Sequence, residues 1–182
     1  MTGPTYLTIL RMILAVLFTV FAMLSPTWAK IVALVLFAIA TITDKIDGAW
    51  ARSKHLVTDL GAFLDPLADK MLVNLAFLVL VYLGTIPLWV FAIILVRDFA
   101  VDGMRMMSAK DGITVPASFL GKLKTTLQMV ALTIILFNLI IDNNIVGIIG
   151  DIALYLALFM TIYSGADYLI KGYKCSIKKS KK

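Results

Sequence analysis

The sequence is poor in several residue types on which common active sites depend. Its 182 residues include one cysteine, one histidine and no glutamate, so all 11 acidic residues are aspartates. The single cysteine, Cys175, excludes an internal disulfide, and with only His55 beside it the chain lacks the Cys/His spacing of zinc or di-iron sites. A metal site in this chain must therefore use oxygen ligands. Charge is scarce too, at 15% of residues, which is well below the roughly 25% of soluble domains.

Apolar residues take the place of the missing charge. They make up 61% of the sequence, and the mean hydropathy is +0.96. A membrane-spanning helix needs about 20 apolar residues, and short polar or Pro/Gly-containing stretches separate the apolar segments of this chain. We predict six spans, at residues 7–24, 29–50, 60–83, 88–108, 120–141 and 145–170. The sequence thus predicts an all-α integral membrane protein with six transmembrane helices in a single domain, residues 1–182.

Basic residues are distributed unevenly over the two sides that six spans define. Sixteen of the 17 Lys and Arg residues fall on the side of the termini, and only Lys30 falls on the other. Since cytoplasmic segments carry the excess of Lys and Arg, both termini are predicted to be cytoplasmic. The multi-pass protein would lie in the cell (cytoplasmic) membrane, with its active site facing the cytoplasm. The net charge of +6 suits anionic membrane lipids, and nothing in the sequence is typical of a nucleic-acid-binding module.

Four aspartates lie at the adjoining ends of the second and third spans. Asp44 and Asp47 close the second span, and Asp65 and Asp69 open the third. At about 100° per residue, each pair occupies one helix face, and the short loop between the spans returns the two faces toward each other. Four carboxylates at membrane depth repel one another unless cations neutralise them, and oxygen ligands favour Mg²⁺ or Mn²⁺. The alternative is that these residues cap helices or pair with nearby lysines.

Small residues and an arginine accompany the carboxylates. The first aspartate pair shares its face with Gly48, Ala51 and Arg52, and the second pair with Gly61. Glycine and alanine leave room for a ligand to approach the backbone, although close helix packing explains small residues in membrane helices as well. The arginine offers a planar fork that matches phosphate oxygens. Together these parts predict a diphosphate held between divalent cations and an arginine.

The same residues form a pattern that resembles a known family. Residues 44–69 match D-x2-D-G-x2-A-R-x8-G-x3-D-x3-D, the signature of the CDP-alcohol phosphotransferases, at all eight fixed positions. The resemblance implies the six-helix fold of that family, a homodimer, two divalent cations (Mg²⁺ or Mn²⁺), and attack of an acceptor hydroxyl on a CDP-linked substrate with release of CMP. The residue roles that it implies are metal ligation by Asp44, Asp47, Asp65 and Asp69, general-base catalysis by Asp69, and CDP binding by Gly48, Ala51, Arg52 and Gly61.

Stretches outside the signature are similar to one branch of that family, the phosphatidylglycerophosphate synthases. They lie at residues 7–11, 56–58, 63–70, 97–101, 103–105, 120–125 and 164–168. This similarity implies CDP-diacylglycerol as the donor and glycerol 3-phosphate as the acceptor. An acceptor phosphate needs a cationic pocket, for which the candidates are Arg97, Arg105, Lys122 and Lys124. Snorkelling of long basic side chains to the membrane interface is the alternative explanation.

Three positions depart from that branch. Its members often begin with an Asn-Pro-Asn-like segment, whereas residues 3–5 of this chain read Gly-Pro-Thr. They usually carry Glu at the position of Asp98 and a neutral residue at that of Asp102. These two aspartates are one helical turn apart and are candidate ion-pair partners for Arg97 and Arg105. Such pairs would partly neutralise the predicted phosphate pocket.

Other acceptors and other classes of protein stand as alternatives. A sister phosphotransferase would use inositol phosphate, serine or phosphatidylglycerol, and of these only inositol phosphate needs a cationic pocket. A UbiA-like prenyltransferase also holds a diphosphate with Asp clusters and Mg²⁺, but its clusters are spaced differently. A small transporter or channel would hold ions with acids near the bilayer midplane, rather than at the cytoplasmic ends of two adjacent helices.

Overall fold

The computed structural model of the protein describes residues 3–54, 59–110 and 119–180, with side-chain placement left out for residues 3–5, 7, 44–54, 59–67, 69, 105, 107–110, 119 and 169–180. The described chain forms six helices: α1 (Gly3–Met23), α2 (Thr27–Lys54), α3 (Asp59–Tyr82), α4 (Leu88–Lys110), α5 (Phe119–Ile141) and α6 (Asn144–Ser180). Since these ranges contain no strand, the prediction of an all-α fold is confirmed. Each predicted apolar segment coincides with one helix to within a few residues, except that α6 continues to Ser180.

Two of the described helices are long and apolar enough to cross a membrane. They are Leu120–Ile141 in α5 and Asn144–Tyr168 in α6, and α1, α2 and α3 contain shorter apolar stretches. Large apolar side chains are exposed on the outside of the helices, among them Val96, Phe99 and Ile145, each about two-thirds exposed. An apolar exterior of this kind suits hydrocarbon better than water. The number of spans and the side on which the termini lie stay predictions.

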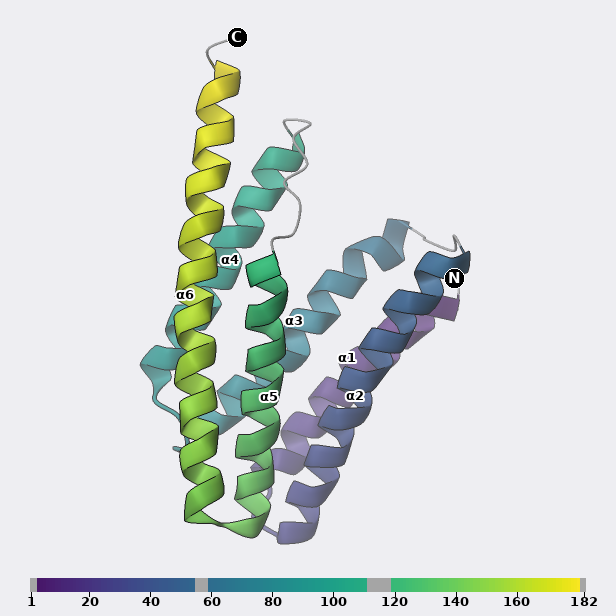
Figure 1. Ribbon diagram of the computed structural model, residues 1–182. Coiled ribbons are helices and arrows are strands. Elements are labelled where there is room, and N and C mark those ends of the chain that lie inside the picture. Colours follow the sequence, from purple (N-terminus) through teal and green to yellow (C-terminus); the bar gives the residue numbers. More distant parts are fainter. Residues whose placement is uncertain (1–2, 55–58, 111–118, 181–182) are drawn as a thin grey trace.

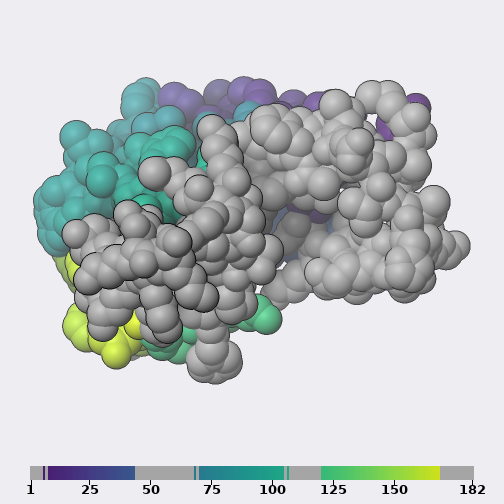
Figure 2. All heavy atoms as spheres, turned by 90° about the horizontal axis from the view of Figure 1, so that it is seen from above, coloured from purple at the N-terminus to yellow at the C-terminus, as the bar shows by residue number. Residues whose placement is uncertain are grey.

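The helices form two groups of three (Figure 1). α1 packs on α2 and α3, and α6 packs on α4 and α5. Contacts of α2 with α5, and of α3 with α4 and α5, join the two groups. The start of α1 and the end of α6 lie toward the same end of the bundle, where α2 also ends and α3 begins (Figure 1). We call this the signature end, because the signature residues lie in the last turns of α2 and the first turns of α3. Figure 2 looks onto it, with described atoms of α3 and α4 in teal between those of α1 in purple and α6 in yellow.

Short turns at the opposite end make consecutive helices antiparallel neighbours. α3 is followed by Gly84 with a φ of 70°, a left-handed conformation that glycine adopts without steric cost. Only Asp142 and Asn143 separate α5 from α6. Asp142 has a φ of 48°, and the Asn143 Oδ1 accepts a hydrogen bond from the Ile145 amide at 2.9 Å. This amide is one of the donors that a helix start leaves unpaired, so Asn143 caps α6.

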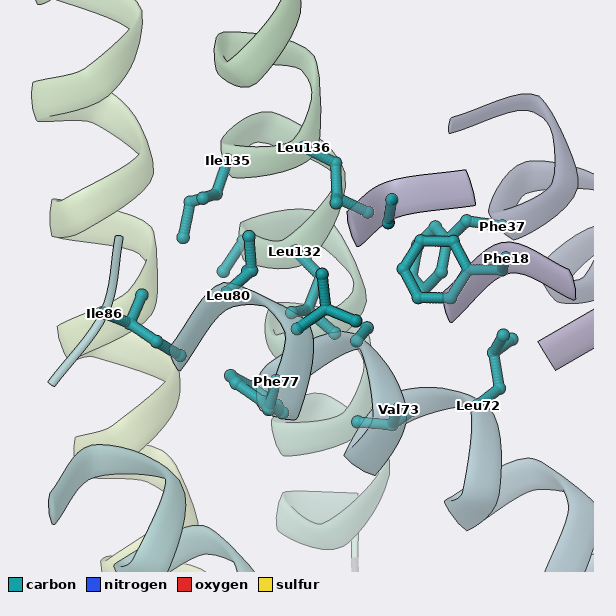
Figure 3. Close-up of a cluster of buried hydrophobic side chains, with 14 of the residues drawn as sticks. Phe18, Phe37, Leu72, Val73, Phe77, Leu80, Ile86, Leu132, Ile135 and Leu136 are labelled. Carbon is teal, nitrogen blue, oxygen red and sulfur yellow. The ribbon is translucent and has the colours of Figure 1, made fainter. Parts of the chain in front are cut away.

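The apolar core lies where the two groups meet (Figure 3). Phe18 of α1 and Phe37 of α2 pack with ring centroids 5.6 Å apart. Phe77 and Leu80 of α3 lie against Leu132 of α5 in the same cluster, and all five side chains are buried. Within a membrane, close packing of this sort holds helices together, since lipid tails are as apolar as the side chains. The core therefore holds α3, which carries three of the eight signature residues, against α1 of its own group and α5 of the other.

Lys30 is the one basic residue predicted on the side away from the termini. Its Nζ donates a hydrogen bond to the Leu139 carbonyl at 3.2 Å, which links α2 to the last turn of α5. The last carbonyls of a helix lack partners in their own helix, and a cation there also interacts favourably with the helix dipole. Lys30 thus has a structural role, which explains its departure from the charge asymmetry.

Candidate functional site

A polar cavity of about 230 Å³ lies at the junction of α3, α4, α5 and α6. Its charged lining residues are Lys70 of α3, Arg97, Asp98 and Asp102 of α4, and Lys122 and Lys124 of α5. We call it the junction cavity. Three of the four residues predicted to bind an acceptor phosphate, Arg97, Lys122 and Lys124, line it together. The side chain of the fourth, Arg105, lies outside the described residues.

The Asp98 carboxylate joins two of these cations. Its Oδ1 accepts hydrogen bonds from Arg97 Nη1 at 3.1 Å and from the Lys124 ammonium. The side chains are 15% exposed for Arg97, 13% for Asp98 and 7% for Lys124. Charges buried to this extent need a partner, because removal from water costs each of them several kcal/mol. Asp98 therefore allows α4 and α5 to hold two cations side by side.

Arg97 is also anchored to α6. Its Nε donates to the Thr161 carbonyl at 3.1 Å, and its Nη2 donates to Ser164 Oγ at 2.8 Å. Gly165 makes this approach possible, because a Cβ at that position would lie 2.8 Å from the Cγ of Arg97. With the bond to Asp98, three of the five guanidinium donors are committed to protein atoms. Arg97 is thus fixed in position, with two donors left for a ligand.

The other cations of the junction cavity are held differently. Lys70 forms an ion pair with Asp102, which ties α3 to α4. The spacing within α4 does not predict this partner for Asp102, since the sequence pairs it with Arg105. Lys122 has an exposed side chain and no ion-pair partner in the part of the chain that the structure describes. Its ammonium is therefore the charge in the cavity that is most available to a ligand.

The charges of the cavity do not cancel. Its lining contains two lysines on α5, one on α3 and one arginine on α4, against two carboxylates, which leaves a net charge of +2. Cations held at fixed positions by ion pairs and hydrogen bonds attract anions, and charge-assisted hydrogen bonds to phosphate oxygens are short and strong. The junction cavity is therefore suited to a phosphate monoester.

The predicted metal ligands and CDP-binding residues lie on α2 and α3 at the signature end. Residues 44–52 belong to the last turns of α2, and Gly61, Asp65 and Asp69 to the first turns of α3. These two helices contact each other. The side chains of all eight signature residues lie outside the described residues, so their convergence stays a prediction. Among the residues whose side chains are described, no group of three or more metal-ligating types could hold an ion.

A model of one protein family matches most of the chain, residues 1–163, and that family is described as CDP-alcohol phosphatidyltransferase. This chain belongs to the CDP-alcohol phosphatidyltransferase family. Its recognition from the signature is thereby confirmed. The matched segment includes α1 to α5 and more than half of α6, and it contains every lining residue of the junction cavity except Tyr168.

Individual relatives carry a more specific name, CDP-diacylglycerol–glycerol-3-phosphate 3-phosphatidyltransferase. The Bacillus subtilis protein is 40% identical over 123 residues, which cover 68% of this chain and 64% of the relative. The Rickettsia bellii protein is 40% identical over 118 residues, 64% of this chain and 65% of the relative. This chain thus covers less than two thirds of the length of both. The Sodalis glossinidius protein is 37% identical over 171 residues, 91% of this chain and 92% of the relative.

Several residues of the cavity in this CDP-alcohol phosphatidyltransferase family member escape sequence reasoning. Lys70 directly follows Asp69 and ends the branch-like stretch 63–70, but the sequence offers it as a counter-ion for the signature aspartates and does not assign it to the phosphate pocket. Asn74 and Gln128 line the cavity as well, and neither belongs to a motif. A polar side chain within an apolar run is a usable signal, because such groups in membrane helices rarely face lipid. The sequence does not say which helices those side chains meet.

Proposed function

We propose that this protein transfers a phosphatidyl group from CDP-diacylglycerol to glycerol 3-phosphate, giving phosphatidylglycerophosphate and CMP. The names of the Bacillus, Rickettsia and Sodalis relatives support this reaction. The observation that carries the proposal is that the cationic junction cavity lies next to the signature residues in the chain, since Lys70 lines the cavity. This residue comes directly after the signature residue Asp69. Val73, four residues beyond Asp69, also lines the cavity, and residues four apart share a helix face.

The cavity would receive the acceptor. Lys122 contributes an ammonium that has no ion-pair partner among the described residues. Arg97 contributes the two guanidinium donors that Asp98, Thr161 and Ser164 leave over. Lys124 lies beside them and is neutralised in part by Asp98. These groups would hold the acceptor phosphate, and Arg105, from the same helix as Arg97, would be a further residue that binds it. A phosphate fixed here would leave the other end of the acceptor free to reach toward the first turns of α3.

The signature residues would hold the donor and perform the transfer. Asp44, Asp47, Asp65 and Asp69 offer carboxylate oxygens only, which fits two hard divalent cations such as Mg²⁺ or Mn²⁺. When bound, these cations supply the charge neutralisation that phosphoryl transfer requires. Asp69 would accept the proton of the acceptor hydroxyl as that oxygen attacks the β-phosphorus and CMP leaves. The CDP moiety would contact Gly48, Ala51, Arg52 and Gly61.

The setting of the reaction is part of the same proposal. The enzyme would be a homodimer in the cytoplasmic membrane, each chain a single domain of residues 1–182 with six spans and both termini in the cytoplasm. The charge asymmetry of the sequence supports this orientation. Membrane lipids would surround the apolar outer faces of α4, where Val96 and Phe99 are exposed, and of α6, where Phe159 is exposed. The donor, itself a lipid, could then enter from the bilayer.

Release of CMP by the purified protein tests the proposal. The full chain in detergent receives CDP-diacylglycerol and Mg²⁺ with glycerol 3-phosphate, inositol 1-phosphate, serine or no acceptor. We expect release with glycerol 3-phosphate alone, its loss on chelation of divalent cations, and its return with Mg²⁺ or Mn²⁺. Asp69→Asn should lower kcat by at least about 100-fold, since it removes a base and a carboxylate ligand. The matched control is Asp151→Asn, because Asp151 is exposed on α6, away from the cavity lining.

Each other outcome has a definite meaning. Release with inositol 1-phosphate would keep the reaction and replace the acceptor, since that compound also needs a cationic pocket. Release with serine would mean that the junction cavity does not bind the acceptor. An absence of CMP from folded protein with every acceptor, under both Mg²⁺ and Mn²⁺, would contradict the proposed function.

A further inference from the structure

Two uncharged side chains of the junction cavity have buried oxygens that are left unpaired. Gln128 of α5 is 1% exposed, and its Oε1 has no hydrogen-bond partner among the described residues. The same holds for Oδ1 of Asn74 on α3. Both residues line the cavity. A buried acceptor without a partner costs free energy and is rare in folded proteins, so we expect the occupant of the cavity to supply the missing donors.

The orientation of the Gln128 amide follows from its neighbours. The Thr161 hydroxyl donates its single proton to the Ala157 carbonyl at 2.6 Å. It can therefore only accept at its other side, where Gln128 lies at 3.2 Å. The amide atom facing Thr161 must be the donor Nε2, because two acceptors would repel each other. Oε1 is consequently the end of the amide that is left for a ligand.

The Gln128 oxygen lies in the same cavity as the cations Lys122 and Arg97, and the two kinds of group together restrict which ligands fit the cavity. A phosphate dianion brings acceptor oxygens and no proton, so it satisfies Lys122 and Arg97 but not the Gln128 oxygen. A hydroxyl group brings the donor that is missing. The occupant that satisfies both parts of the lining carries a phosphate and at least one hydroxyl besides the one that reacts.

We propose that Gln128 Oε1 accepts a hydrogen bond from a non-reacting hydroxyl of a phosphorylated polyol acceptor, with Asn74 as a second acceptor. Gln128 is thereby the residue that makes the enzyme prefer such polyols over simple phosphorylated alcohols. This inference rests on the proposed function and deepens it. The physical basis is that a site built around a substrate hydroxyl rejects an analogue lacking it, since its own buried group is then left unpaired.

A pair of acceptors tests the role of Gln128. Glycerol 3-phosphate and 3-hydroxypropyl phosphate share the phosphate and the terminal hydroxyl, and differ only by the central hydroxyl. The measurement is kcat/KM from CMP release by the full chain in detergent. The wild type should prefer glycerol 3-phosphate by about tenfold or more. Gln128→Met, of similar size without the amide, should lose that preference by a fall for glycerol 3-phosphate with an unchanged value for the analogue.

A second variant tests the same point through the orientation of the amide. Thr161→Val removes the hydroxyl that holds Nε2, while the backbone carbonyl that receives Arg97 stays in place. We expect its preference for glycerol 3-phosphate over 3-hydroxypropyl phosphate to lie between that of the wild type and that of Gln128→Met. The matched control is Thr133→Val, because Thr133 is an exposed threonine of α5 whose hydroxyl bonds within its own helix. Its preference should equal that of the wild type.

The possible results separate this inference from the proposed function. If the wild type releases CMP with both acceptors equally, or if Gln128→Met lowers both values alike, the inference is wrong and the proposed function stands. In the second case Gln128 acts on both acceptors alike, and its Oε1 does not distinguish them by the central hydroxyl. If Gln128→Met does not fold, the comparison of Thr161→Val with Thr133→Val decides. If the wild type releases CMP with neither acceptor, the proposed function fails and the inference fails with it.

Discussion

The apolar core and the junction cavity share helices α3 to α6 but depend on different physics. The core of Phe18, Phe37 and Phe77 contains no polar side-chain atoms, so the fit of the side-chain shapes decides its stability. In the cavity, by contrast, Asp98 has two specific partners and Arg97 has three. A substitution in the core changes the number of packing contacts between apolar side chains. A change in the cavity leaves a buried charge or donor without its partner.

This difference predicts that substitutions in the core mainly affect stability, whereas substitutions in the cavity mainly affect activity. α3 belongs to both regions, since Phe77 is in the core and Lys70 is in the cavity. Variants of the core should therefore unfold more easily while the folded fraction stays active. Variants of the cavity should lose activity even where the fold survives.

The largest effect is expected at Asp98. Asp98→Asn keeps the size of the side chain and removes the charge between Arg97 and Lys124, which leaves two buried cations facing each other. Loss of one partner from a buried ion pair costs about 3 kcal/mol or more, and we expect kcat/KM for glycerol 3-phosphate to fall at least about 100-fold. The measurements are CMP release and thermal unfolding in detergent. Wild-type activity in this variant would mean that the carboxylate does not position the two cations.

The core variant Phe77→Ala tests the other side of the comparison. Phe77 is fully buried, and removal of a buried aromatic ring lowers the free energy of unfolding by about 3 kcal/mol or more. We expect a lower unfolding temperature and an unchanged kcat for the protein that remains folded. The two readouts are thermal unfolding and CMP release scaled to the folded fraction. A fall in kcat as large as that of Asp98→Asn would show that the two regions do not act independently.

A smaller and more local effect is expected at Gly165. The new Cβ of Gly165→Ala would lie 2.8 Å from Cγ and 3.0 Å from Nε of Arg97. Because three hydrogen bonds tie the guanidinium, the side chain shifts only by straining them, and we expect kcat/KM to fall about tenfold. The matched control is Gly103→Ala, where the new Cβ meets no described atom within 4 Å. Its activity should stay near that of the wild type; equal losses in the two variants would show that crowding of Arg97 is not the cause.

Much of the fold could be predicted because each helix contains one predominantly apolar segment, and polar or Pro/Gly-containing stretches separate these segments. The turn residues Gly84 and Asn143 end or begin helices by local chemistry that the sequence carries. The candidate site could be predicted less completely. Arg97, Lys122 and Lys124 come from the resemblance to the family, whereas the pairing of Lys70 with Asp102 does not. Their contact joins two helices, and helical spacing gives information only within one.

By itself, the sequence determined the all-α class, the approximate position of each helix and the family, because hydropathy and the signature spacing are properties of local segments. Only the tertiary structure decided how the charges are shared in the junction cavity. It brings Asp98 between Arg97 and Lys124, gives Asp102 to Lys70, and leaves Lys122 unpaired among the described residues. The physical reason is that a buried charge is stabilised by whichever opposite charge the packing brings within a few ångströms. That neighbour is set by the crossing of helices far apart in the chain.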